Sequence, residues 1–334
     1  MTTKGTHMAD KLQVSIVGLG MIGISAGLAL RRYQDRVTVI AHDLSPEASS
    51  LAKRMGAVDR TEWNLISAVV KADRVILALP VHELRDTLAA IGPELKAGSV
   101  VMDTAEVKVP VIQWAAELLP EGVHFVGGHP IVMAERLDRE GARADLFEKK
   151  LFCLTPDGRT NDAAVRLAAD VVEAMGGQPF FMDPAEHDGL AAGVEQLPAI
   201  LSGALMSVTT RSPGWSDMRK VAGNQYFLST LLTAETGMAA ASAAVANREH
   251  TVHWLDTVIR ELETWRDRVA AGDTEGLAEG FDVGMNAVQR WVVAQITGNW
   301  EEEKLPAELP TGGSVFKDLF FGRRPSPAER LKRK

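Results

Sequence analysis

Short apolar runs alternate with helical stretches over the first half of the chain. Seven such runs occur between Leu12 and about Asp183, and most are too continuously apolar to have one face in water. They span residues 13–17, 36–40, 74–79, 99–102, 124–126, 151–154 and 178–182. Strands that are buried on both faces and separated by helices are typical of a mainly parallel sheet with helices on both sides. The pattern therefore predicts a doubly wound α/β domain.

Helical periodicity replaces the strand pattern after Pro184. Apolar residues recur there at intervals of three or four: Leu190, Val194, Leu197, Leu201, Leu205 and Val208. This spacing marks one face of a helix, in which Pro198 predicts a kink because proline lacks the backbone N–H that the helix needs. The same spacing returns over 252–265 and 281–296. We therefore expect an all-helical second domain, and its wide apolar faces predict a homodimer because they would otherwise be exposed.

These patterns divide the 334-residue chain into four segments. Residues 1–11 are polar and aperiodic, and we interpret them as an expression tag or a disordered segment. Residues 12–183 are the predicted α/β domain, and residues 184–298 are the predicted helical domain. Residues 299–334 form a polar tail, whose last eighteen residues hold seven Lys or Arg against two Asp or Glu. A solvated tail is the preferred interpretation, with an anion-binding arm as the alternative.

Composition favours a small molecule as the partner of this chain. The formal net charge of -8 argues against general affinity for nucleic acid, which depends on positive charge. No stretch approaches the roughly 18 to 20 uncharged apolar residues of a membrane span, and no secretory signal is visible, so we expect a cytoplasmic protein without membrane contact. The single cysteine, Cys153, has no partner for a disulfide or a zinc pattern. We expect a buried strand thiol there and no metal site.

A glycine-rich turn follows the first apolar run and opens the first helical stretch. Its residues are Gly18, Leu19, Gly20, Met21, Ile22 and Gly23. In a GxGxxG turn the first glycine makes the tight turn, the second lets the backbone approach a pyrophosphate, and the third lets the helix pack on the strand. The N-terminus of the helix then presents N–H groups and a partial positive charge to the phosphates. The turn therefore predicts a dinucleotide-binding Rossmann domain.

A carboxylate strengthens this interpretation and selects the cofactor. Asp43 follows the second apolar run, twenty residues beyond Gly23. A carboxylate in this place accepts hydrogen bonds from the ribose hydroxyls of NAD and repels the 2′-phosphate of NADP. The alternative role for Asp43 is a helix cap before Ser45. We predict NAD rather than NADP, and we also assign Leu79, Pro80 and Asp103 to the cofactor site.

Four motifs in this order resemble the prephenate and arogenate dehydrogenases of tyrosine biosynthesis. They are the glycine turn, Asp-Thr-Ala-Glu-Val-Lys at 103–108, Gly-Gly-His-Pro at 127–130, and Pro-Ala-Glu-His-Asp at 184–188. The resemblance implies a Rossmann domain followed by a helical dimerisation domain. It also implies an oxidation in which hydride leaves the ring carbon that bears the 4-hydroxyl, carbon dioxide is lost and the ring becomes aromatic. A histidine in the Gly-Gly-His-Pro motif accepts the hydroxyl proton in such enzymes, which makes His129 the predicted catalytic base, and a neutral imidazole suits that task.

The chain departs from the family pattern where the family contacts its substrate. Glu106 stands where the family usually has serine, and Ile-Val-Met at 131–133 replaces Met-Ala-Gly. Glu195 and Gln196 replace Ser-His before Leu-Pro, and Leu231 replaces an arginine that binds a carboxylate of prephenate. A desolvated arginine–carboxylate contact contributes about 2 to 5 kcal/mol, and nearby carboxylates repel a dianion. We therefore expect poor turnover of prephenate itself.

The residues assigned to the substrate site are Glu106, Lys108, His187, Glu195, Gln196 and Leu231. Capping and packing is the preferred role for His187, while Lys108 either caps a helix or attracts a carboxylate. Three functions remain open. The first is a dehydrogenase of the prephenate type, which includes one for an amino-bearing relative because Glu106 suits an ammonium group. The others are an oxidoreductase with a neutral or cationic substrate, and a protein that binds NAD without turnover.

Overall fold

The computed structural model describes residues 11–133, 136, 138–231 and 237–300 of the chain. The predicted N-terminal tag, apart from Lys11, and the predicted basic tail, apart from residues 299–300, lie outside the described residues. The chain forms two compact units, Met1–Leu255 and Asp256–Lys334. The sheet and the candidate site both lie in the first unit.

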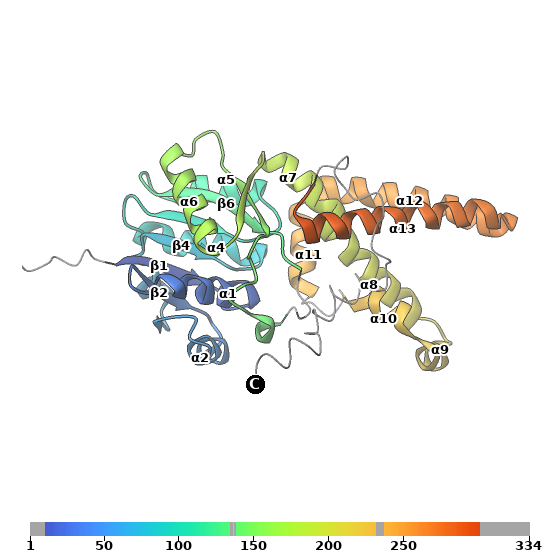
Figure 1. Ribbon diagram of the computed structural model, residues 1–334, viewed down its shortest axis with the longest axis horizontal. Helices are drawn as coiled ribbons and strands as arrows, with labels where there is room; N and C mark the ends of the chain where they lie inside the picture. Colours follow the sequence, from blue (N-terminus) through green and yellow to red (C-terminus); the bar gives the residue numbers. More distant parts are fainter. Residues whose placement is uncertain (1–10, 134–135, 137, 232–236, 301–334) are drawn as a thin grey trace, which may run out of the picture. The chain divides into compact units, whose positions relative to one another are not determined.

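The first unit is built on an eight-stranded sheet in the order β3-β2-β1-β4-β5-β6-β7-β8 (Figure 1). The strands are β1 Leu12–Val17, β2 Val37–His42, β3 Arg60–Thr61, β4 Arg74–Leu77, β5 Val100–Asp103, β6 His124–Pro130, β7 Leu151–Thr155 and β8 Gln178–Phe181. Neighbouring strands are parallel except β6 and β7, which are antiparallel. All seven predicted runs are strands, and the doubly wound, mainly parallel sheet is confirmed. The two-residue strand β3 was not predicted because it is too short and polar to give an apolar pattern.

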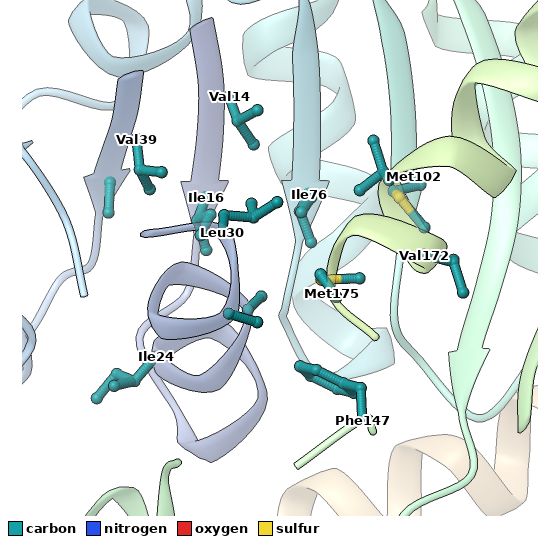
Figure 2. Packing of buried hydrophobic residues seen from close by; sticks show 14 of the residues in the cluster. Val14, Ile16, Ile24, Leu30, Val39, Ile76, Met102, Phe147, Val172 and Met175 are labelled. Atoms are coloured by element: carbon teal, nitrogen blue, oxygen red, sulfur yellow. The ribbon is translucent and has the colours of Figure 1, made fainter. Parts of the chain in front are cut away.

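Helices cover both faces of the sheet. They are α1 Met21–Leu30, α2 Pro46–Arg54, α3 Leu65–Val69, α4 Val81–Ile91, α5 Val109–Leu118 and α6 Asp162–Ala174, with short turns η1 Arg31–Tyr33, η2 Gly92–Glu94 and η3 Arg139–Gly141. Alternate strand residues pack into two separate cores. Ile16 belongs to the core that includes α1 and α6, while Val17 belongs to the core that includes α3, α4 and α5. Figure 2 shows the first core, where Ile76 of β4 lies near Leu30 of α1. This double burial explains why the strand runs are continuously apolar.

Among the described residues after Asp183, helices are the only regular secondary structure, which confirms the predicted helical second half. They are α7 Pro184–Ala191, the π-helical turn η4 Ala192–Gln196, α8 Leu197–Thr210, α9 Trp215–Val221, α10 Asn224–Thr230, α11 Gly237–Ala246, α12 Arg248–Ala271 and α13 Thr274–Thr297. Asp183 starts α7 as its N-cap, since its carboxylate accepts hydrogen bonds from the backbone of Ala185 and Glu186. A kink was predicted at Pro198, and a π-helical turn ends two residues before this proline. Such turns often occur at functional sites, and this one carries Glu195 and Gln196.

Two smaller observations concern Cys153 and one long apolar segment. Cys153 lies in β7 and is buried, as predicted, and burial raises the pKa of its thiol to about 11. The segment Pro184–Thr210 is long and apolar enough to cross a membrane by length and composition alone. The same test is passed by helices of proteins without membrane contact, so it is weak evidence for a span.

Candidate active site

Steric contacts distinguish the three glycines of the turn between β1 and α1. Gly18 has φ +94°, and a Cβ at this position would collide with the carbonyl oxygen of Ala78. A Cβ at Gly23 would collide with the carbonyl oxygen of Gly18. A Cβ at Gly20 would meet no atom within 4 Å. Packing of the protein therefore requires glycine at the first and third positions, whereas the open space at Gly20 fits the backbone approach of a bound pyrophosphate.

Asp43 joins the end of β2 to this turn. Its Oδ2 accepts a hydrogen bond from the backbone N–H of Leu19 at 2.6 Å, and its Oδ1 accepts one from Ser45 at 2.7 Å. The N-cap of α2 is Ser45, whose side chain accepts from Ala48, so Asp43 does not cap that helix. The carboxylate is placed at the carboxyl end of β2, beside the glycine turn, where a ribose of a dinucleotide binds in this fold.

A cavity of about 360 Å³ opens beside the glycine turn. It brings together segments from the β1–α1 turn, the loops after β4 and β5, the end of β6 and the π-helical turn. The predicted site residues that line it are Gly20, Met21, Ile22, Leu79, Pro80, Glu106, His129 and Glu195. Predicted cofactor residues and predicted substrate residues thus share one cavity, which is the arrangement that hydride transfer requires.

His129 belongs to a chain of hydrogen bonds that leads away from this cavity. Its Nδ1 lies 3.0 Å from Nε2 of His187, and Nδ1 of His187 lies 2.9 Å from Oδ1 of Asp188. An ionised carboxylate only accepts, so His187 donates from Nδ1, and in its neutral form it accepts at Nε2. His129 must then donate from Nδ1. This order leaves Nε2 of His129 as the atom with a lone pair, ready to accept a proton.

The surroundings of His129 keep its imidazole neutral. Burial, followed by the neighbouring His187 and the charge of Lys108, holds the pKa of His129 well below its ordinary value of 6.5. A base must be unprotonated before it can accept a proton. His129 is therefore in the basic form near pH 7.

Asp188 anchors the hydrogen-bonded series His129–His187–Asp188 to the start of α5. Its Oδ1 also accepts from the backbone N–H of Lys108 at 2.7 Å, and its Oδ2 accepts from Val109 at 2.8 Å. These N–H groups belong to the start of α5, where a carboxylate is favoured by the helix dipole. Asp188 and His187 are both buried. The sequence signal was the His-Asp pair at the start of a helix, which resembles an exposed capping sequence. The structure instead places His187 in hydrogen-bond contact with His129 and outside the cavity lining.

Lys108 and Asp103 are placed differently from the prediction. Both side chains are fully buried and form an ion pair, and Nζ of Lys108 also donates to the carbonyl oxygen of Gly128 at 2.6 Å. Asp103 accepts from the backbone N–H of Gly128 at 3.1 Å and of Ala105 at 2.9 Å. Lys108 is therefore committed to Asp103 and does not face a substrate carboxylate, and Asp103 does not line the cavity. The pair instead ties the loop after β5 to the strand that carries His129.

Gln196 and Asn247 support Glu106. Nε2 of Gln196 donates to Oε2 of Glu106 at 3.0 Å, and Nδ2 of Asn247 donates to Oε1 of Gln196 at 3.1 Å. Asn247 also donates to the carbonyl oxygen of Asp188 at 2.7 Å. Gln196 thus lies behind the cavity wall and orients a residue that lines it. Asn247 was not predicted, because no motif marks it.

Leu231 lies apart from these residues in the structure. It follows α10, its side chain is 43% exposed, and it does not line the cavity. The structure therefore does not bring the position of the family's arginine to the candidate site. Within the part of the chain that the structure describes, no group of three or more His, Cys, Asp or Glu side chains is placed to hold a metal ion.

Comparison with known proteins agrees with this geometry. The model of the prephenate dehydrogenase nucleotide-binding domain matches residues 26–180, and that of the prephenate dehydrogenase dimerization domain matches residues 183–283. The chain belongs to the prephenate dehydrogenase family. Its enzymatic class is that of a dehydrogenase of the prephenate dehydrogenase type, with a nucleotide-binding Rossmann domain.

Relatives of this family cover most of the chain. A cyclohexadienyl dehydrogenase of Zymomonas mobilis is 28% identical over 82% of this chain and 94% of its own length. The probable prephenate dehydrogenase NovF of Streptomyces niveus is 30% identical over 83% of this chain and 75% of its own length. Among solved structures, prephenate dehydrogenase from A. aeolicus in complex with hydroxyphenyl propionate and NAD+ has a TM-score of 0.75 and 25% identity, and it covers 84% of this chain and 98% of its own.

Proposed function

We propose that this family member uses NAD to oxidise and decarboxylate a cyclohexadienyl substrate to an aromatic product, as in tyrosine biosynthesis. The observation that carries the proposal is the shared cavity, in which the base His129 and the open glycine turn face the same space. Ring oxidation needs a hydride acceptor and a proton acceptor at one carbon atom, and this cavity provides a place for both.

The chain's own residues suit NAD. Gly20, Met21 and Ile22 at the N-terminus of α1 would hold the pyrophosphate, because the N-cap glycine has no side chain that competes for the N–H groups of the first turn. Asp43 would accept from the ribose hydroxyls, and Leu79 and Pro80 would line the path toward His129. The bound cofactor supplies the acceptor for the hydride, and the structure of A. aeolicus prephenate dehydrogenase contains NAD+.

The protein moves the proton through His129. Nε2 of His129 takes a proton from the group on the ring carbon that loses hydride, and the resulting imidazolium is stabilised through His187 by the carboxylate of Asp188. The carbon–carboxylate bond of the ring breaks, carbon dioxide leaves, and the electron pair of that bond completes the aromatic ring. The gain of aromaticity makes the reaction effectively irreversible.

We expect one molecule of carbon dioxide to be released for each NADH formed. Incubation of the full chain and NAD with prephenate, arogenate and their 4-amino analogues tests this, with NADH followed by absorbance and carbon dioxide by a coupled carboxylase assay. NADH without carbon dioxide would assign the site to a simple alcohol or amine oxidation. No NADH with any of these compounds, despite measurable NAD binding, would favour a protein that binds NAD without turnover.

We also propose that NAD binds at least about tenfold more tightly than NADP, because Asp43 would repel a 2′-phosphate. Isothermal titration of both cofactors measures this ratio. Asp43→Asn removes the charge, so the preference should shrink in that variant, with circular dichroism as a check of folding because Asp43 also accepts from Leu19 and Ser45. Equal affinities of the unmodified protein for both cofactors would refute the assignment.

We further propose a homodimer formed through the helical domain. The matched family model is that of a dimerization domain. In the second unit, large apolar side chains on α12 and α13 are exposed, such as Ile259 at 51%, Leu262 at 56% and Phe281 at 66%. Large apolar surfaces of this kind are unusual on monomers and mark interaction sites.

A cytoplasmic enzyme is part of the same proposal. The apolar segment Pro184–Thr210 includes Gln196, which is buried and hydrogen-bonded to Glu106 and Asn247. A segment that carries part of a folded polar site belongs to the globular enzyme, and its apolar character suits helix packing. Small molecules, and neither nucleic acid nor membrane, remain the expected partners.

A further inference from the structure

We propose that the substrate is a cyclohexadiene that carries an amine, in place of the 4-hydroxyl, on the ring carbon that loses hydride, and that Glu106 binds its ammonium form. This inference rests on the proposed function and names the substrate class of the same site. It was one of several possibilities at the level of sequence, and the placement of Glu106 now favours it.

The charge of the cavity supports an ammonium group. Its ionisable lining residues are Glu106, Glu195 and His129, and none of the residues described as lining it is Lys or Arg. Lys108, the cation nearest in sequence, forms a buried ion pair with Asp103 and does not line the cavity. A carboxylate in a partly closed cavity favours a nearby cation, because interactions between charges are stronger there than in bulk water. A substrate with a ring ammonium offsets the charge of Glu106, whereas a ring hydroxyl does not.

The support behind Glu106 indicates that its carboxylate is held in place. Gln196 donates to its Oε2, and Asn247 holds Gln196 from the other side. Gln196 is buried, so its amide is a fixed donor aimed at the carboxylate. Residues that orient a charged group in a cavity are typical of a binding site built for a complementary charge.

Glu106 lines the same cavity as His129. It lies in the loop after β5, and β5 pairs with β6, the strand that carries His129. The Asp103–Lys108 pair fastens that loop to the backbone of Gly128, next to His129. The ring carbon that loses hydride must lie beside both His129 and the cofactor. An ammonium on that carbon lies in the cavity that Glu106 lines, whereas the ammonium of arogenate is at the end of the substrate's side chain.

The reaction balances with NAD as the oxidant. The ammonium first gives one proton to Nε2 of His129, because its nitrogen needs a lone pair to support the departure of hydride. The carbon–hydrogen bond of the ring carbon then breaks, and the hydride goes to NAD+. The ring carboxylate leaves as carbon dioxide, and the electron pair of the carbon–carboxylate bond completes the aromatic ring. The product is a neutral aromatic amine, and the proton passes from His129 to solvent. The amine substrate thus releases one more proton per NADH than a hydroxyl substrate, because the phenol keeps its proton. Hydration of the carbon dioxide to bicarbonate adds the same proton for all substrates.

The test compares three substrates and two variants of the full chain. Prephenate, arogenate and 4-amino-4-deoxyprephenate are assayed with NAD for kcat/KM, and proton release is measured at pH 7 in weak buffer with a pH indicator. Glu106→Gln removes the charge but can still accept from Gln196. Glu94→Gln is the matched control, because Glu94 lies in the turn before β5, at the opposite end of the strand from Glu106.

We expect the 4-amino substrate to have the highest kcat/KM, and to release one more proton per NADH than prephenate or arogenate, whose proton release comes only from hydration of carbon dioxide. Glu106→Gln should lower its kcat/KM, relative to that of the hydroxyl substrates, by about 10- to 100-fold, as expected for a lost charge-assisted hydrogen bond. Glu94→Gln should leave this ratio unchanged. KM should carry most of the change, since Glu106 binds the ammonium and does not take the proton.

The possible failures can be told apart. Preferred turnover of prephenate or arogenate, or an unchanged ratio in Glu106→Gln, would overturn the amine inference and leave the proposed dehydrogenase function standing. Absence of NADH with all three substrates, in a protein that binds NAD by titration, would overturn the proposed function and this inference with it.

Discussion

Replacing His129 by asparagine is expected to lower kcat by about 10²- to 10⁴-fold, which is the usual contribution of a general base. Asparagine keeps a polar side chain of similar width but cannot accept the proton. NAD affinity should change little, because the expected contacts of the cofactor lie at the glycine turn and Asp43. Steady-state NADH formation and isothermal titration with NAD measure the two properties separately.

The pH profile provides a readout that a purely structural role of His129 would not produce. Since burial lowers the pKa of His129, the acid limb of kcat/KM should lie below pH 6.5 in the unmodified enzyme and should be absent from the residual activity of His129→Asn. The lowered pKa of His129 also makes the folding stability depend on pH, with a loss of stability toward acid pH. The unfolded chain takes up a proton near pH 6.5 and the folded chain only at lower pH, so His129 makes folding less favourable as pH falls below 6.5. Equal kcat in the variant and the unmodified enzyme would remove His129 from the mechanism.

Asp188→Asn distinguishes the positioning role of Asp188 from that of the base. Its carboxylate accepts from His187 and from two N–H groups at the start of α5. The variant should lose part of kcat, and it should also be less stable, because an amide has only one oxygen for these donors. A variant with normal kcat would show that His187 alone positions His129.

The sheet could be predicted because one physical constraint controls each strand. Strands buried on both faces give continuous apolar runs, and all seven runs became strands. The short helices α9 and α10 were missed because their residues are mostly exposed and carry no apolar stripe. Local patterns report burial, and exposed short helices leave no such signal.

The candidate site was predicted only as far as local motifs reach. The glycine turn and Asp43 were recognised because their spacing follows from the geometry of one β-α-β unit. The contact between His129 and His187 joins residues 58 positions apart, so no local spacing reveals it. Lys108 and Asp103 were assigned to ligands from their place in the motif at 103–108, and their mutual pairing depends on the packing of the loop after β5 against β6. Leu231 was placed by gapless alignment with a family motif, and the structure shows it outside the cavity lining.

Gly20→Val is expected to remove most NAD binding, at least about 100-fold, without loss of folding. The valine side chain would occupy the open space that the pyrophosphate needs, and no protein atom lies within 4 Å of its Cβ. The φ of -73° at Gly20 is accessible to any residue, so the backbone carries no added strain.

The matched variant is Gly23→Val, in which the same side chain is added three residues later. There the Cβ would collide with the carbonyl oxygen of Gly18, and α1 would have to move away from β1. Overpacking of this kind costs about 1 to 3 kcal/mol or more, so Gly23→Val should unfold at a lower temperature whether or not NAD is present. Thermal melts followed by circular dichroism, with and without NAD, separate the two effects: Gly20→Val should melt like the unmodified apoprotein but gain no stability from NAD. Retention of the NAD-induced shift in Gly20→Val would show that the cofactor does not pass over this turn, and an equally unstable Gly20→Val would show that the second glycine, like the third, serves packing alone.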